Sequence, residues 1–261
     1  MKKLKLINSD YFKEYSIKCK ILFPLHKLNP KAEFSLEDFD YYIIASSLYS
    51  SKIEGNTLDV DSFFRNRGKK TSLKKKEVQE IEDLVKSYRF CSENKLNKTN
   101  FFKTHGLLSK SILPIKERGR IRKGTMMVRD SKSLKPVYVA VEPEFVKAEL
   151  NKLFSDISEL LKYDLSYKEI FYYASMIHIC IAKIHPFNDG NGRSARLLEK
   201  WFLVSKLGQS AWSINSEKYY WDNRPEYYQN ISLGYNYYHL FWDRCLAFLL
   251  MLPKALKEST L

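Results

Sequence analysis

The chain has 261 residues, of which 44% are apolar, and it contains only 9 glycines and 8 prolines. This composition excludes a disordered, collagenous or linker-dominated chain and disfavours a loop-rich all-β fold. The net charge of +14 points to a polyanionic partner such as nucleic acid, an acidic membrane surface or a phosphate-rich ligand. Only 11 of the 44 basic residues are arginine, and lysines more often keep a surface solvated than bind phosphate bidentately. A solvated basic surface is therefore the simpler interpretation.

The cysteines and the start of the chain indicate a reducing compartment. Cys19, Cys91, Cys180 and Cys245 lie far apart with no CxxC spacing, so we predict neither a disulfide framework nor a zinc site. The opening MKKLKLINSD lacks the apolar region of a signal peptide. No apolar run approaches the roughly 18 residues that a membrane span needs. We therefore expect a cytoplasmic protein outside the membrane.

Helical periodicity dominates the chain. A helix is expected at 36–53, where Ser35 and Asp38 resemble a capping box. The segment 167–184 carries apolar residues at three- and four-residue steps, as a core helix does. Further helices are expected at 75–91, 98–113, 144–163, 192–207, 224–234 and 236–251, and Gly208 ends the one at 192–207.

One region departs from the helical pattern. Between 119 and 142, two β-rich pieces, Met126–Val128 and Val137–Ala140, flank the polar turn DSKSLK and predict a β-hairpin. No internal repeat, low-complexity tail or linker interrupts the rest. We therefore expect an all-α (mainly α) chain that forms a single compact unit bearing one small hairpin.

Reactive side chains are concentrated in the segment 184–196, which reads IHPFNDGNGRSAR. Gly190 and Gly192 let the backbone turn sharply and approach a ligand closely. The helix that follows begins with unpaired amides and a positive dipole end, which together cradle an anion. Arg193 and Arg196 project from its first turn, and two guanidinium groups suit a polyphosphate.

The same segment contains groups for chemistry beside a phosphate. Asp189 is its one carboxylate, and Mg²⁺ is commonly held by one or two carboxylates together with substrate phosphates. His185 is its one group with an ordinary pKa near neutrality, suited to take a proton from a hydroxyl. His178 lies seven residues earlier, and we interpret it as a core histidine rather than as part of a metal pair.

The string from His185 to Arg196 resembles the signature of the Fic (Fic/Doc) family, H-x-F-x-[D/E]-G-N-[G/K]-R-x-x-R, and matches it at every fixed position. The resemblance implies a helical core with a β-hairpin flap ahead of the catalytic helix, and the predicted hairpin lies in that place. It also implies transfer of AMP from ATP to a Ser, Thr or Tyr hydroxyl of a protein, with Mg²⁺.

The resemblance assigns roles residue by residue. His185 becomes the general base, Phe187 the buried anchor of the loop, and Asp189 the Mg²⁺ ligand. The flap residues Met126, Met127 and Val128 become the edge along which a target segment adds as a strand. ATP binding is expected from Asn188, Gly190, Asn191, Gly192, Arg193 and Arg196, with Arg196 on the γ-phosphate, and from Tyr227 and Tyr228 near Asn223 and Arg224.

A second motif lies upstream. Ser50 to Gly55 reads SSKIEG and resembles the family's inhibitory motif [S/T]-x-x-x-E-[G/N]. Taken without that context, it reads as a helix end closed by a glycine cap. In the family context, a helix at about 36–55 would be inhibitory. Glu54 would reach Arg196 and occupy the place of the γ-phosphate, and Ser50 would steady the helix end.

The resemblance divides the chain into an N-terminal helical region, 1–95, and a Fic core, 96–261, with its flap at 119–142 and its loop at 185–196. Transfer of another nucleotide such as UMP and removal of AMP remain alternatives, whereas Gly192 argues against the phosphotransferase branch, which usually has lysine there. A different class is a nucleic-acid-binding regulator, based on the basic run Arg65–Lys76. The expected partners are ATP, an unidentified target protein that Lys116–Lys123 would favour if acidic, and a second copy of the chain.

Overall fold

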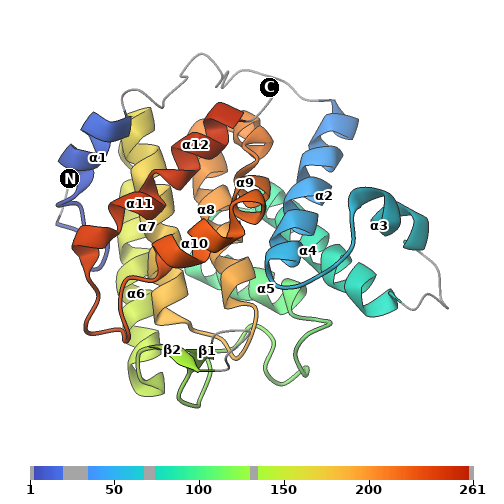
Figure 1. Cartoon of the computed structure of the whole chain (residues 1–261), viewed down its shortest axis with the longest axis horizontal. Coiled ribbons are helices and arrows are strands. Elements are labelled where there is room, and N and C mark those ends of the chain that lie inside the picture. The colour runs from blue at the N-terminus through green and yellow to red at the C-terminus, as the bar shows by residue number, and fades with distance from the viewer. Residues whose placement is uncertain (1–2, 20–34, 68–73, 130–134, 259–261) are drawn as a thin grey trace.

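A computed structural model describes residues 3–19, 35–67, 74–129 and 135–258. Their helices and the hairpin form the mainly α fold with one small antiparallel sheet that the sequence predicted (Figure 1). Among these residues, no helix is both long and apolar enough to cross a membrane. The α-helices are α1 Phe12–Cys19, α2 Leu36–Ile53, α3 Val60–Asn66, α4 Lys75–Glu93, α5 Lys98–Leu108, α6 Pro143–Leu160, α7 Tyr167–Ile184, α8 Asn191–Leu207, α9 Ser216–Asp222, α10 Arg224–Ile231, α11 Leu246–Leu249 and α12 Met251–Glu258.

Helices α7 and α8 pack against each other at the centre of the molecule (Figure 1). A capping box starts α7, because the Ser166 side chain and Glu169 satisfy each other's backbone amides. Nearly every residue of α7 is buried, so apolar side chains surround the helix and it needs neighbours on all sides. These neighbours include α1, α6, α11 and α12, while α2, α4 and α5 reach α8 from its other side. The loop between α7 and α8 is thereby held in the core.

The predicted division at 95/96 falls between α4 and α5, which pack against each other. Helix α2 packs against both α4 and α9 and so links the early part of the chain to its late part. The N-cap of α2 is as expected, because the Ser35 hydroxyl accepts a hydrogen bond from Asp38 N at 3.0 Å. All four cysteines are buried and free.

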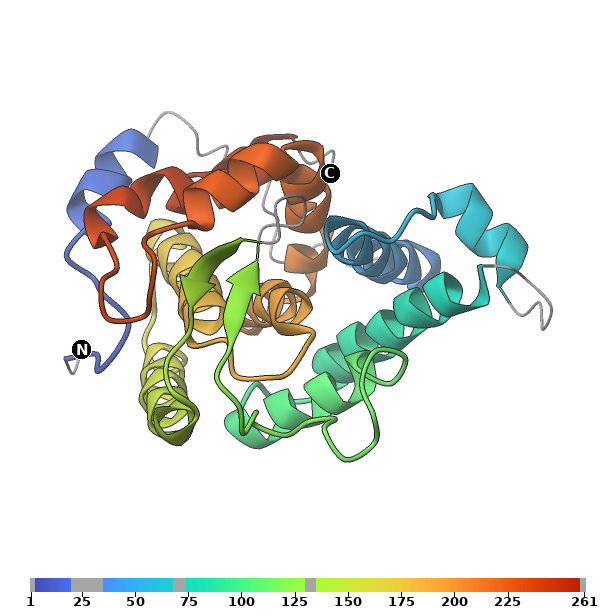
Figure 2. The same ribbon diagram turned by 60° about the horizontal axis from the view of Figure 1, so that its bottom comes forward.

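The hairpin consists of β1 Met127–Arg129 and β2 Pro136–Val139, with Val128 opposite Tyr138. Its predicted turn, DSKSLK, falls largely outside the described residues. Figure 2 shows the hairpin in front of the ends of α7 and α8. A late segment covers the far edge of β2, because Val139 N donates to Tyr235 O (2.8 Å) and Tyr237 N donates to Val139 O (3.1 Å).

That pairing explains why the predicted helix at 236–251 is wrong. The backbone of residues 235–237 bonds to β2, so the chain becomes helical again only as a short 3₁₀ turn at Trp242–Arg244, followed by α11. The helix expected at 98–113 ends at Leu108, where the Ser109 hydroxyl bonds to His105 O. Helices α1, α3 and α9 were not predicted, since each is too short for a clear periodic signal.

The N-terminal segment is held by one buried carboxylate. Asp156 of α6 is 2% exposed and accepts hydrogen bonds from the amides of Lys5, Leu6 and Ile7 at 2.7–2.9 Å. Replacing Asp156 with alanine leaves these amides without that acceptor, and we expect a loss of about 1–3 kcal/mol in the free energy of unfolding. Chemical denaturation measures this loss, and limited proteolysis should cut the early residues faster. The exposed Asp164 provides the control, since Asp164→Ala should change little.

Candidate functional site

The segment between α7 and α8 forms a rigid loop around Phe187. Helix α7 ends at His185, whose φ of 51° lies in the left-handed region, and Gly190 caps α8 with a φ of 77°. Histidine rarely adopts this conformation, so the surroundings must hold it there. Phe187 is fully buried, and its ring stacks on the ring of His105 at a centroid distance of 3.5 Å. The expectation that Phe187 anchors the loop agrees with this placement.

Two side chains brace the loop from within. The Asn191 side chain accepts from Phe187 N at 2.9 Å and donates to Phe187 O at 2.8 Å. His105 Nδ1 accepts from Gly119 N at 2.9 Å, so its Nε2 carries the proton and donates to Asp189 O at 3.0 Å. Burial lowers the pKa of His105 to about 4, which keeps this neutral arrangement at physiological pH. Because the Asn191 side chain is occupied, anion binding falls to the backbone amides.

The start of α8 offers those amides. Ser194 N makes the bond to Gly190 O, at 2.9 Å, so the amides of residues 191–193 precede the first hydrogen bond of the helix. Together with the positive end of the α8 dipole they can bind a phosphate. Glu54 Oε1 occupies the space that a Cβ at Gly192 would fill, so glycine lets this carboxylate lie against the start of α8.

His185 lies at the end of α7 with its ring half-buried. Its Nδ1 lies 3.2 Å from Ala182 O, which fixes the proton on that nitrogen and leaves Nε2 as a proton acceptor. Burial lowers the pKa of His185 to about 4, opposed by the Ala182 carbonyl and Glu54 and assisted by the charges of Arg122 and Lys183. The imidazole is therefore neutral at physiological pH, as a general base requires.

Arg196 is 1% exposed and is held on several sides. Its Nε donates to the Ser50 hydroxyl at 2.9 Å, and its Nη2 donates to Ser50 O at 2.9 Å and to Glu54 Oε1 at 2.7 Å. Its Nη1 donates to the Tyr227 hydroxyl at 3.2 Å. The end of α2 thus contacts α8 at Arg196. The structure places Glu54 beside Arg196, where the sequence analysis expected it.

A buried polar chain supports Arg196 from behind. Arginine can only donate hydrogen bonds, so the Tyr227 hydroxyl oxygen accepts from Arg196. The same hydroxyl donates its hydrogen bond to His178 Nε2, 3.0 Å away. His178 Nδ1 then donates to Glu199 Oε2 at 2.9 Å. His178 and Glu199 are fully buried, and Tyr220 also donates to Glu199. The interpretation of His178 as a core histidine is confirmed by this burial.

Glu54 closes the end of α2 beside Arg196. Burial of its carboxyl would raise its pKa, but the charges of Arg196 and Arg193 and the bond from Arg196 outweigh this and hold the pKa below its usual value. Glu54 is therefore ionised at physiological pH. With 32% of its side chain exposed, the carboxylate keeps an open side toward solvent from which it could be displaced.

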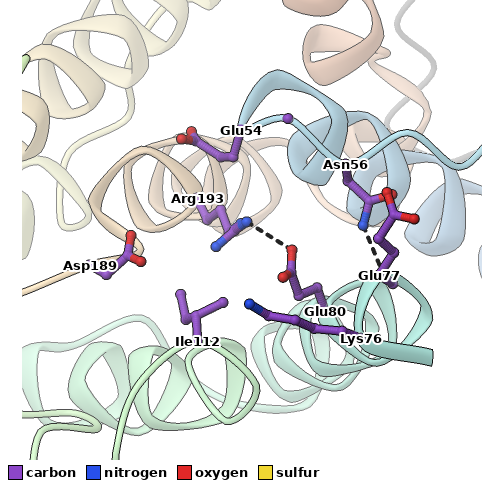
Figure 3. Close-up of a pocket in the computed structure, with 9 residues that line it drawn as sticks. Glu54, Asn56, Lys76, Glu77, Glu80, Ile112, Asp189 and Arg193 are labelled. Carbon is purple, nitrogen blue, oxygen red and sulfur yellow. Dashed lines mark hydrogen bonds and ion pairs between the residues drawn. The ribbon is translucent and has the colours of Figure 1, made fainter. Parts of the chain in front are cut away.

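Arg193 faces a cavity of about 410 Å³ between the end of α2, the start of α4, the loop after α7 and the start of α8 (Figure 3). Its Nη2 lies 3.2 Å from Glu80 Oε2 of α4, and its buried Nε has no partner among the described residues. Both motif arginines are thus paired with carboxylates at one cavity. The wall consists of Glu54, Gly55, Asn56, Lys76, Glu77, Glu80, Ile112, Asp189 and Arg193.

Asp189 lies exposed at the edge of this cavity, and its Oδ1 accepts from Gly190 N at 2.6 Å. No group of three or more metal-ligand side chains occurs in the described part of the chain. A metal site built by the protein alone is therefore absent there. One carboxylate beside a phosphate-binding helix end fits Mg²⁺ that takes its other ligands from phosphates and water.

The remaining predicted residues lie around this centre. Asn188 is exposed and donates to Glu117 Oε2 at 2.7 Å, so it ties the loop to the segment before the hairpin. Tyr228 donates to Ile53 O at 3.0 Å, at the end of α2. In the hairpin, Met127 is 46% exposed, and Val128 lies beside it on β1.

A known protein family and solved structures resemble this chain in sequence motif and in fold. The model of the Fic/DOC family matches residues 95–203. This part of the chain is thus similar to a Fic/DOC domain. Members of this family commonly transfer a nucleotide, AMP, onto proteins.

Solved structures share the fold over almost the whole chain. A Fic family protein from Desulfovibrio desulfuricans has a TM-score of 0.73 at 19% identity and covers 98% of this chain and 75% of its own. A Fic domain containing signaling protein from Bacteroides thetaiotaomicron has a TM-score of 0.66 at 20% identity, with 96% and 94% covered. Fic-1 from C. elegans has a TM-score of 0.63 at 20% identity, with 96% and 71% covered. At these identities the likeness shows the fold alone.

Sequence reasoning missed three residues that contact the loop or the start of α8: His105 at Asp189 O, Glu80 at Arg193 and Arg122 at His185 O. His105 and Glu80 lie 84 and 113 positions from their partners in the loop and in α8. Neither belongs to a motif, so only the packing of α4 and α5 against α8 reveals them. Arg122 lies in the predicted hairpin region among several basic residues, and the sequence does not show which of them is buried.

Proposed function

We propose that this Fic protein is an adenylyltransferase that transfers AMP from ATP to a Ser, Thr or Tyr hydroxyl of a target protein or of itself. One observation carries the proposal. A neutral histidine ends α7 and, a short loop later, two arginines held by displaceable carboxylates begin α8. A base beside a site for several phosphates is what nucleotide transfer requires.

The residues divide the reaction among them. His185 Nε2 takes the proton of the target hydroxyl while its oxygen bonds to the α-phosphorus, and the bond to the β-phosphate oxygen breaks to release pyrophosphate. The first amides of α8 and Arg193 bind the phosphates, and Arg196 binds the γ-phosphate. Asp189 would hold Mg²⁺, which supplies positive charge to the phosphates when bound. Glu54 competes for Arg196 and so inhibits the resting protein.

The hairpin supports docking of an extended target. Residues 235–237 cover one edge of β2, whereas β1 pairs only with β2 in the described part of the chain. Met127 and Val128 therefore lie on the edge to which a target strand would add its backbone hydrogen bonds.

The pKa of His185 predicts an unusual pH profile. The base acts in its neutral form, and a pKa of about 4 keeps it neutral well below the ordinary histidine value of 6.5. We expect initial rates of transfer by the Glu54→Gly protein to stay nearly constant from pH 8 to about 5 and to fall as the pH drops toward 4. Circular dichroism at each pH checks that the protein stays folded. Half-maximal activity near pH 6.5 would contradict the assignment.

A nucleotide panel tests the function. The Glu54→Gly protein is incubated with Mg²⁺ and each of ATP, UTP, GTP and CTP, and mass spectrometry reads the adduct and its site. An addition of AMP that disappears in Glu54→Gly/His185→Ala supports the proposal, whereas UMP would change the nucleotide and no adduct would reject transfer. Incubation with a purified AMP-modified protein detects removal of AMP. A salt-dependent shift of duplex DNA without adduct would favour the nucleic-acid-binding alternative.

A further inference from the structure

Arg122 stands apart from the basic residues around it because its side chain is buried, with 2% exposure. The segment 116–123 otherwise reads as a solvated basic run. No described carboxylate forms an ion pair with Arg122, and every hydrogen bond of its guanidinium goes to a backbone carbonyl. A buried cation with only carbonyl partners is costly unless those partners are fixed and well placed.

One set of these carbonyls belongs to the end of α7. Arg122 Nε donates to His185 O at 2.8 Å, its Nη2 lies 3.4 Å from Ile184 O, and its backbone amide donates to Pro186 O at 3.0 Å. The last carbonyls of a helix lack internal partners and carry its negative dipole end, so a cation is stabilised there. Arg122 thus holds the backbone of His185, whose left-handed φ sets the direction of the imidazole.

The other set belongs to the two legs of the hairpin. Arg122 Nη1 donates to Gly124 O at 2.8 Å, just before β1, and Nη2 donates to Val141 O, just after β2. A planar guanidinium directs its N–H groups in a fixed fork, so these carbonyls take a set position relative to His185. Figure 2 shows the hairpin in front of the central helices, with one leg leading from the α5 side and the other into α6.

We propose that Arg122 is a positioning residue that fastens both legs of the hairpin to the backbone of His185, so that a hydroxyl presented on β1 meets the imidazole. This inference rests on the proposed function, since it assigns His185 as the base. Lysine cannot replace it, because a single ammonium cannot reach the carbonyls of both sets in one plane.

A measurement that needs no activity tests the positioning first. Nuclear magnetic resonance follows the titration of the His185 ring, whose signal is identified by its loss in His185→Ala. The charged groups acting on this ring are Arg122 and Lys183, which lower its pKa, and Glu54, which raises it. In Arg122→Gln we expect the ring to titrate at a higher pH than in the parent, and hydrogen exchange at Met127 and Val128 to accelerate. An unchanged titration and unchanged exchange would overturn the proposal.

Activity provides the second readout. In the Glu54→Gly background, Arg122→Gln should lower the transfer rate roughly 100-fold, the order expected for a reacting group misplaced by about 1 Å, with little change in the ATP concentration for half-saturation. Arg122→Lys keeps the positive charge but loses the planar guanidinium, so its transfer rate should also fall. The pH at which its activity drops in acid should stay near that of the parent. A rate equal to the parent in both variants contradicts the proposal.

Controls separate positioning from general loosening. Tyr138→Phe removes the bond from the hairpin to Lys183 O, 2.7 Å long, without touching the His185 carbonyl, so the ring titration should not move. Arg120→Gln changes an exposed neighbour and should leave the His185 ring titration unchanged. If the Glu54→Gly protein transfers no nucleotide, the proposed function fails while the ring titration still decides the role of Arg122. Loss of folding in both Arg122 variants would overturn the proposal, because Arg122 would then serve the fold.

Discussion

Replacing His185 with alanine in the Glu54→Gly protein is expected to lower AMP incorporation by about 10²–10⁴-fold, the usual contribution of a general base. The imidazole is neutral and its Nε2 has no described partner, so Nε2 can accept the hydroxyl proton. Incorporation is measured by labelled nucleotide and by intact mass.

ATP binding provides the control for this variant. The phosphate-binding groups begin at α8 and do not contact the imidazole in the described structure, so the dissociation constant of ATP should stay within a few-fold of the parent. A second control replaces the buried His178, which should instead disturb the support of Arg196 and weaken ATP binding. If His185→Ala still modifies its target at the parent rate, the base is another residue.

Replacing Glu54 with glycine should raise AMP incorporation by an order of magnitude or more. The carboxylate holds Arg196 Nη2 at 2.7 Å, and an arginine–carboxylate pair uses the same donors that a terminal phosphate needs. A lower pKa keeps Glu54 ionised, so the competition persists throughout the physiological range. Time courses of labelled incorporation into the protein itself, and into any target, measure the gain.

Matched variants sharpen that result. Glu54→Gln keeps the shape but removes the charge, and we expect an intermediate gain because the amide still lies near Arg196. Glu37→Gly changes an exposed glutamate at the other end of α2 and should leave incorporation as in the parent. Equal incorporation by the parent and Glu54→Gly would show that the end of α2 does not inhibit the site.

The sequence revealed the loop and the fold because both depend on local signals. The apolar periodicity of 167–184 predicts helix α7. The spacing of Arg193 and Arg196 places both on the first turns of the helix that follows the loop. The approach of Glu54 to Arg196, 142 positions apart, required the family resemblance rather than any local pattern. Without that resemblance, SSKIEG would have been read as a helix end alone.

The site contacts that the sequence missed, and the wrong helix at 236–251, were decided by contacts between distant segments. Arg122 reaches His185 O across 63 positions, and Glu80 reaches Arg193 across 113, so no window of sequence contains either pair. The expected helix at 236–251 gave way because β2 offered its edge to residues 235–237. In each case tertiary packing set the structure where local propensity was weak or misleading.

Gly192 links two properties of this protein through a single missing atom. A Cβ at this position would collide with Glu54 Oε1, so a side chain there would make the carboxylate shift from its present contact with Arg196. If Glu54 inhibits as proposed, lysine at 192, which the phosphotransferase branch usually carries, would displace Glu54 as well as alter the phosphate site. Under the proposed function, the residue at position 192 therefore affects both the phosphate site and the contact that would inhibit it.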